Sequence, residues 1–132
     1  MTTKILIVED EILVALQLED VLTDAGHAVL GVVPDRCGLS RISEPPQVAL
    51  VDVNLRDGRS GPSIAHELAD TFGTRIVYVT ANPDQIGIPA STAVGYVGKP
   101  FCGPAILEAV NFAMHGLTDV DRPTALHPVA YP

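Results

Sequence analysis

The sequence Val48-Ala-Leu-Val-Asp-Val53 contains one carboxylate, Asp52, inside an otherwise apolar run. A run of this kind, without polar alternation, is typical of a strand that is buried on both faces of a parallel sheet. A charged side chain is not expected at such a position unless a partner or a ligand requires it. The stretch therefore predicts a buried strand over Val48–Val53 and a functional role for Asp52.

Other apolar runs on both sides of this stretch alternate with segments of helical periodicity. Further strands are expected at Ile5–Val8, Ala28–Val33, Arg75–Val79 and, briefly, Tyr96–Val97, and helices at Ile12–Ala25, Asp35–Ser43 (weak), Pro62–Phe72 and Pro104–His115. In the first helix, Ile12, Ala15 and Leu18 recur at helical spacing and are expected to share its buried face. Five strands that alternate with helices predict an α/β fold, a doubly wound parallel sheet covered on both faces.

Two segments are expected to lack regular structure. The stretch from Ala81 to Val94 contains Pro83, Gly87 and Pro89, so we expect a loop with at most one or two helical turns there. Residues 117–132 contain three prolines and little periodicity. We therefore expect one domain over residues 1–116 and a tail over 117–132 that is extended or poorly ordered.

Composition excludes several classes of function. The 132 residues suffice for one domain, and 16 acidic against 8 basic residues give a net charge of −8, which argues against a nucleic-acid partner. Cys37 and Cys102 form no CxxC pair, which favours reduced thiols in a cytoplasmic protein. No apolar run approaches the ~20 residues that membrane insertion needs, and the N-terminus does not resemble a signal peptide.

Polar side chains follow four of the predicted strands. Glu9-Asp10-Glu11, Asp52, Thr80 and Lys99 each come at or just after a strand end. In open parallel sheets the carboxyl ends of the strands form the ligand-binding edge, so these groups are expected to meet. Clustered carboxylates repel one another unless a cation lies among them, and Mg²⁺ suits an all-oxygen site. The acidic triplet alone is equally explained by a helix N-terminus, where the dipole favours acids.

Lys99 and Thr80 also have two interpretations. The chain has only two lysines, Lys4 and Lys99, and Lys99 lies in the otherwise uncharged stretch Gly95–Phe101. It is expected to face a negative charge, although a lysine at an edge can also simply reach water. Thr80 either has a structural role at the end of its strand or donates its hydroxyl proton to a phosphoryl oxygen.

These residues together resemble the receiver domains of two-component response regulators. The matching features are the opening ILIVED at 5–10, Asp52 in VALVDVNL, Thr80-Ala81, and Lys99-Pro100-Phe101, with Tyr96 three residues before the lysine. The resemblance implies a flavodoxin-like, CheY-like sheet of strand order 2-1-3-4-5. The short, helix-poor segment before Lys99 resembles a subgroup of alphaproteobacterial receivers whose fourth helix is shortened or missing.

The resemblance also implies the chemistry of the site. Asp52 would accept a phosphoryl group from a sensor histidine kinase and become a 4-aspartylphosphate. Asp10 and Asp52 would bind Mg²⁺ or Mn²⁺ directly, Glu9 through water, and Asn54 through its backbone carbonyl. Glu9 stands where the family more often has aspartate; because the charge is kept, we expect metal binding to be retained.

The implied output is a change in partner binding. Lys99 would pair with the phosphoryl group, and Thr80 and Tyr96 would act as the switch. The chain would be a single-domain regulator in a phosphorelay, and it would catalyse only its own phosphorylation and dephosphorylation. The alternatives are a non-switching pseudo-receiver that binds proteins constitutively, and a flavin or nucleotide domain. The latter is disfavoured because no glycine-rich loop follows the first strand.

Overall fold

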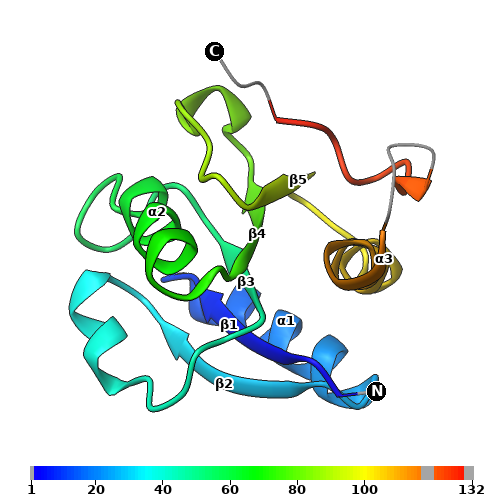
Figure 1. The fold of residues 1–132 in the computed structure, drawn as a ribbon, viewed down its shortest axis with the longest axis horizontal. Coiled ribbons are helices and arrows are strands. Elements are labelled where there is room, and N and C mark those ends of the chain that lie inside the picture. The colour runs from blue at the N-terminus through cyan, green and yellow to red at the C-terminus, as the bar shows by residue number, and fades with distance from the viewer. Residues whose placement is uncertain (1, 117–120, 130–132) are drawn as a thin grey trace.

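The computed structural model describes residues 2–116 and 121–129, and its centre is a five-stranded parallel sheet of order β2-β1-β3-β4-β5 (Figure 1). The strands are β1 (Lys4–Val8), β2 (Ala28–Val33), β3 (Val48–Val51), β4 (Arg75–Thr80) and β5 (Ala93–Gly98). Every neighbouring pair of these strands is parallel. The structure therefore confirms the predicted fold class and strand order.

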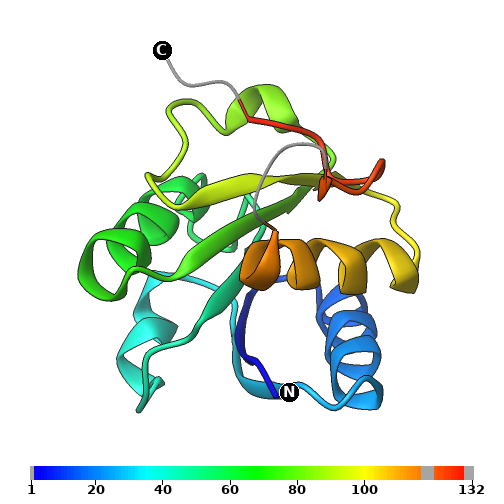
Figure 2. The same ribbon diagram turned by 45° about the vertical axis from the view of Figure 1, so that its right-hand side comes forward.

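Helices cover both faces of the sheet. Helices α1 (Ile12–Asp24) and α3 (Gly103–His115) lie on one side and α2 (Gly61–Phe72) on the other, as Figure 2 shows. Side chains alternate along each strand, so Ile5 and Ile7 enter a core with α1 and α3, whereas Leu6 and Val8 enter a second core with α2. Both faces of the sheet are thus buried, which explains the continuous apolar runs in the sequence.

The segment between β4 and β5 contains no α-helix. It forms a single 3₁₀ turn, η2 (Pro83–Gln85), and then follows an irregular path in which Gly87 adopts a φ of 68°. Ala90 is buried in the second core, where its N–H donates to the hydroxyl of Tyr78 over 3.0 Å. The segment is therefore anchored, and the expectation of a short or missing fourth helix is confirmed.

Three predicted elements differ in extent or type. Strand β3 ends at Val51 rather than Val53, because the N–H of Val53 donates to the side chain of Asp52 instead of to a neighbouring strand. Strand β5 is longer than Tyr96–Val97 and runs from Ala93 to Gly98, since β4 provides a partner along its whole length. The weak helix expected at Asp35–Ser43 is a 3₁₀ helix, η1 (Arg36–Arg41), which the Asp35 side chain caps.

Helix α1 buries less of its predicted apolar face than expected. Ala15, Leu18 and Leu22 are buried, but Ile12 is 72% exposed, so its assignment to the buried face was wrong. Ile12 is the first residue of α1, four residues after β1 ends at Val8. Leu13 and Leu16 are also exposed, at 78% and 49%.

Part of the chain beyond α3 returns to the sheet. His127 forms an antiparallel bridge with Tyr96 on β5, and Leu126 is buried. The sequence did not indicate this contact. Part of the tail that was expected to be extended or poorly ordered, residues 117–120 and 130–132, lies outside the described residues. Within the described ranges, no helix is long and apolar enough to span a bilayer.

Candidate functional site

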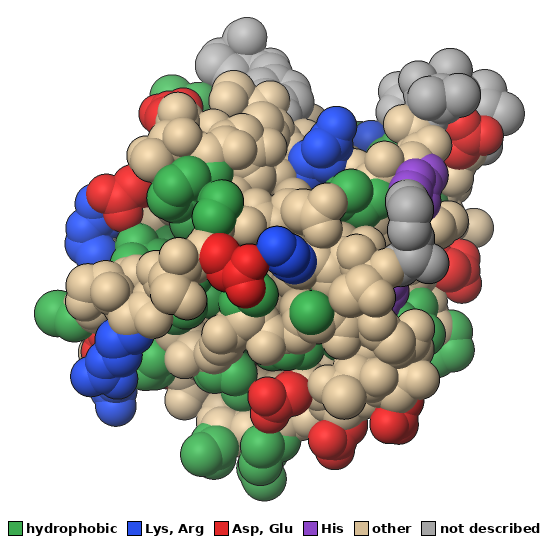
Figure 3. Space-filling view, turned by 60° about the horizontal axis from the view of Figure 1, so that its bottom comes forward, with side chains coloured by type: hydrophobic (Ala, Val, Ile, Leu, Met, Phe, Trp, Pro, Cys, Tyr) green, Lys and Arg blue, Asp and Glu red, His purple; other side chains and the backbone are tan. Residues whose placement is uncertain are grey.

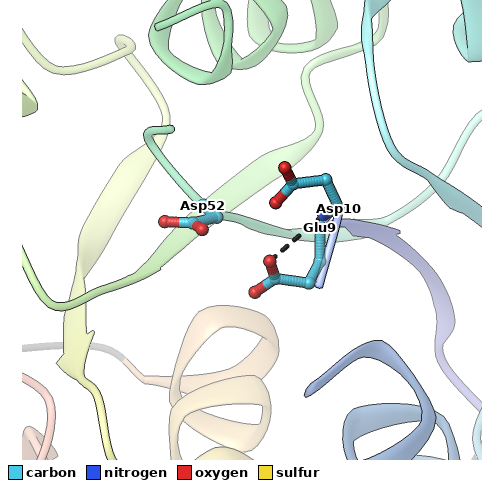
Figure 4. A group of neighbouring side chains, drawn as sticks. All are labelled: Glu9, Asp10 and Asp52. Carbon is cyan, nitrogen blue, oxygen red and sulfur yellow. Dashed lines mark hydrogen bonds between the residues drawn. The ribbon is translucent and has the colours of Figure 1, made fainter. Parts of the chain in front are cut away.

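Two adjacent strand ends bring the carboxylates together. Strands β1 and β3 are paired with Val8 opposite Val51, so the residues that follow, Glu9 and Asp10 on one strand and Asp52 on the other, emerge side by side. The N–H of Asp52 continues the ladder by donating to the carbonyl of Val8 over 2.9 Å. Figure 4 shows the three side chains next to one another at these strand ends.

Lys99 completes the cluster from β5. Its ammonium nitrogen lies 2.7 Å from Oε1 of Glu9 and 3.0 Å from Oδ2 of Asp52. The Lys99 side chain is only 14% exposed. The backbone N–H of Lys99 donates to the carbonyl of Thr80 over 3.2 Å. Burial lowers the pKa of Lys99, but its hydrogen bonds and ion pairs with Glu9 and Asp52 outweigh that effect and raise it. Lys99 therefore stays charged and faces the carboxylates, as the sequence predicted.

Glu9 is the most deeply buried acid in the cluster. Its residue is 2% exposed, and its Oε2 accepts the backbone N–H groups of Asp10 and Glu11, each over 3.1 Å. Burial raises the pKa of Glu9 from 4.5 to about 7, because loss of hydration outweighs the stabilisation by Lys99 and by the backbone donor of Glu11. In the absence of a further cation, Glu9 thus holds its proton more tightly in the folded chain.

This shift predicts a pH-dependent stability. Between pH 4.5 and about 7 the folded chain keeps a proton on Glu9 that the unfolded chain releases, so the free energy of unfolding falls as the pH rises through this window. We expect the stability of the wild type relative to Glu9→Gln to drop by on the order of 3 kcal/mol from pH 4.5 to 8. Urea unfolding in metal-free buffer measures this difference.

The control for this experiment is Glu108→Gln, which removes an exposed carboxylate from α3. Its stability relative to the wild type should vary little with pH. A wild-type advantage over Glu9→Gln that is constant from pH 4.5 to 8 would contradict the raised pKa.

The carboxylate cluster fits a divalent cation. Glu9, Asp10 and Asp52 each offer an oxygen, and these oxygens lie within 4.8 Å of one another. Oε1 of Glu9 is buried and is paired with the Lys99 ammonium over 2.7 Å. Hard oxygen ligands with more than one carboxylate suit Mg²⁺ or Mn²⁺. A cation here would also supply the positive charge that the buried acids lack.

The remaining predicted residues are placed differently. Thr80 is fully buried at the end of β4, and its hydroxyl oxygen accepts the N–H of Asn82 over 2.9 Å. The side-chain amide of Asn54 donates to Gln85 over 2.8 Å. Tyr96 is half-buried on β5 and its ring centroid lies 5.0 Å from that of His127. The roles of Thr80, Asn54 and Tyr96 in phosphoryl contact, metal binding and switching stay predictions.

Glu11 was expected at this edge of the sheet as part of the acidic triplet, but the sequence assigned it no role of its own. Glu11 places Oε1 at 3.6 Å from the Lys99 nitrogen, although its side chain is 64% exposed. The signal was present in the acidic triplet at residues 9–11. Its position adds a third negative partner to Lys99 at the rim of the cluster.

No protein-family model matches the chain. Among curated proteins it is similar to the phyllosphere-induced regulator PhyR of Methylorubrum extorquens, with 36% identity over 114 residues, or 83% of this chain and 42% of that protein. It is also similar to the transcriptional regulatory protein PdtaR of Mycobacterium tuberculosis, with 25% identity over 122 residues, or 89% of this chain and 59% of that protein. The chain thus spans about half the length of these relatives.

A solved structure matches over nearly the full length of both chains. The solution structure of the receiver (REC) domain of the Erythrobacter litoralis response regulator PhyR has 30% identity and a TM-score of 0.77. The match covers 95% of this chain and 97% of that domain.

Proposed function

This chain belongs to the receiver-domain family of response regulators, and we propose that it accepts a phosphoryl group on Asp52 from a sensor histidine kinase. The observation that carries the proposal is the position of Asp52. The residue is 7% exposed at a strand end, and its carboxylate lies 3.0 Å from the ammonium of Lys99, whose side chain is 14% exposed, and beside two further acids. Phosphorylation would make the chain a switch in a phosphorelay, and it would catalyse only its own phosphorylation and dephosphorylation.

The charges around Asp52 suit in-line phosphoryl transfer. An oxygen of Asp52 attacks the phosphorus of a phosphohistidine, and the histidine nitrogen leaves with the bonding pair. Lys99 balances negative charge on the phosphoryl oxygens, and the hydroxyl of Thr80 donates to one of them after it gives up its contact with the Asn82 N–H. Asp10, Asp52 and the carbonyl of Asn54 would hold Mg²⁺, with Glu9 acting through water, and the cation would supply positive charge near the transferring group.

An exposed apolar turn directly follows the acidic cluster in the chain. Ile12, Leu13 and Leu16 are 72%, 78% and 49% exposed in the first turns of α1, directly after the acidic cluster. Figure 3 shows hydrophobic side chains scattered over one face of the molecule, several of which project at its lower edge. Exposed apolar groups that border a reactive site commonly mark a protein-binding surface. We propose that the kinase docks there.

A substitution in this turn should separate protein-mediated from direct phosphorylation. Leu13→Asp is expected to reduce phosphotransfer from the cognate kinase at least about tenfold, which corresponds to losing one well-placed apolar contact. Phosphorylation by the small donor phosphoramidate should be unchanged, because Leu13 makes no part of the carboxylate cluster. Transfer rates are measured with the kinase that phosphotransfer profiling identifies in the same genome.

The matched control is Ile88→Asp, which changes a side chain that is 65% exposed in the segment between η2 and β5. Transfer from the kinase should survive this change. Equal losses in both variants, or a loss of the phosphoramidate reaction in Leu13→Asp, would refute docking at α1.

A non-switching binding module is the second candidate. Lys99 already compensates Glu9 and Asp52 at 2.7 and 3.0 Å, so the site is balanced in part without a metal or a phosphoryl group. Amide NMR spectra that stay the same with and without Mg²⁺ and beryllofluoride would favour this candidate. Shifts along β4, β5 and the segment between them would favour the switch.

A further inference from the structure

Residues 121–129, here called the C-terminal strap, lie along the outer edge of β5. The N–H of Tyr96 donates to the carbonyl of His127, and the N–H of His127 donates to the carbonyl of Tyr96, each over 2.9 Å. Figures 1 and 2 both show the strap, in red, beside β5. Since β5 is the last strand of the sheet, this contact covers an edge that would otherwise be open.

The strap is anchored on both faces of the sheet. Leu126 is 1% exposed and joins the core beneath α1 and α3, whereas Val129 packs against the core on the α2 side. At its start, Arg122 donates through Nη1 to the carbonyl of Val94 over 2.6 Å. The Arg122 guanidinium also lies 5.0 Å from the ring centroid of Phe112 on α3. The strap therefore crosses the edge of β5 from one face to the other.

The edge of β5 is shaped to admit this segment. Gly95 adopts a φ of 153°, and a Cβ added there would collide with the His127 carbonyl and lie 2.7 Å from Nη1 of Arg122. The carbonyls of Val94 and Tyr96 and the N–H of Tyr96 all bond to the strap. Without the strap, these backbone groups would form an open sheet edge, the kind of surface to which an extended peptide adds as a strand.

We propose that the outer edge of β5 is a strand-addition surface for an extended segment of a protein partner, and that the C-terminal strap is its built-in competitor. The fitting segment runs antiparallel to β5, with an arginine for the Val94 carbonyl and, four residues later, an apolar side chain for the Leu126 site. The strap and a partner segment cannot bind at the same time, because both would form their backbone hydrogen bonds with Tyr96. The proposal stands independently of phosphorylation at Asp52.

Opening the strap in the full chain tests this. In Arg122→Ala/Leu126→Ala, the Tyr96 amide is expected to exchange its hydrogen at least about tenfold faster than in the wild type. The Lys99 amide, which bonds to Thr80 within the sheet, should keep its protection and so report that the domain is folded. A labelled peptide of residues 121–129 should bind the double variant saturably and bind the wild type at least about tenfold more weakly, since a tethered segment competes at an effective millimolar concentration.

Two controls define the result. Thr124→Ala changes an exposed residue within the strap and should leave both Tyr96 exchange and peptide exclusion as in the wild type. Arg122→Ala alone, which leaves Leu126 in the core, should show intermediate exchange. The proposal is overturned if the Tyr96 amide is unprotected in the wild type. It is also overturned if the folded double variant does not bind the peptide at about 5 mM, or if the wild type binds it equally well.

Discussion

Asp52→Asn is expected to abolish phosphorylation, taking labelling by phosphoramidate with Mg²⁺ from stoichiometric to undetectable. The amide keeps the shape of the side chain but lacks the anionic oxygen that attacks phosphorus. The fold should survive, because Lys99 keeps its 2.7 Å ion pair with Glu9 and the apolar neighbours of residue 52 are unchanged. Intact mass spectrometry and an amide NMR spectrum measure the two properties on one sample.

Asp57→Asn is the matched control. Asp57 is an exposed aspartate in the loop that follows β3 and is not part of the carboxylate cluster. It should be labelled like the wild type. If Asp52→Asn were still labelled at residue 52, or if both variants lost labelling equally, Asp52 would not be the specific acceptor.

Lys99→Met is expected to destabilise the fold by about 3–5 kcal/mol at pH 8 without metal. Glu9 and Asp52, 2% and 7% exposed, would lose the ammonium that lies 2.7 and 3.0 Å from them and would repel one another. Because Mg²⁺ would bind the same carboxylates, it should restore part of the loss, and the variant should gain more stability from Mg²⁺ than the wild type does. Urea unfolding with and without Mg²⁺ measures both effects.

The chain provides a close control in its second lysine. Lys4 pairs with Glu44 over 2.7 Å, but the two side chains are 49% and 46% exposed. Lys4→Met should therefore cost at most about 1 kcal/mol and should not alter the response to Mg²⁺. Losses of equal size in the two variants, or no added effect of Mg²⁺ in Lys99→Met, would mean that Lys99 does not compensate the buried acids.

The sheet and the core of the site could be predicted because their signals are local. Apolar runs located the strands, and the rule that ligands gather at the carboxyl ends of parallel strands placed Glu9, Asp10 and Asp52 together. Lys99 stood out as a charge in an apolar context. Pro83, Gly87 and Pro89 were sufficient to exclude a regular helix before β5.

The features that were missed depend on contacts distant in sequence. Strand β5 begins at Ala93 because β4 pairs with it, although Gly95 weakens the local strand signal. The periodicity of α1 cannot tell that Ile12, at the start of the helix, is left exposed. Leu126 lies in a short, non-periodic segment between Pro123 and Pro128, so no local pattern shows that it joins the core beside α3. Tertiary packing decides all three.

Mapping the phosphorylated residue in the wild-type chain tests the central claim most directly. After reaction with phosphoramidate and Mg²⁺, we expect one phosphoryl group per chain, located by tandem mass spectrometry on Asp52, and none when EDTA removes the metal. A chain that stays unmodified under these conditions, or that carries the phosphoryl group at Asp10 or another residue, would contradict the account.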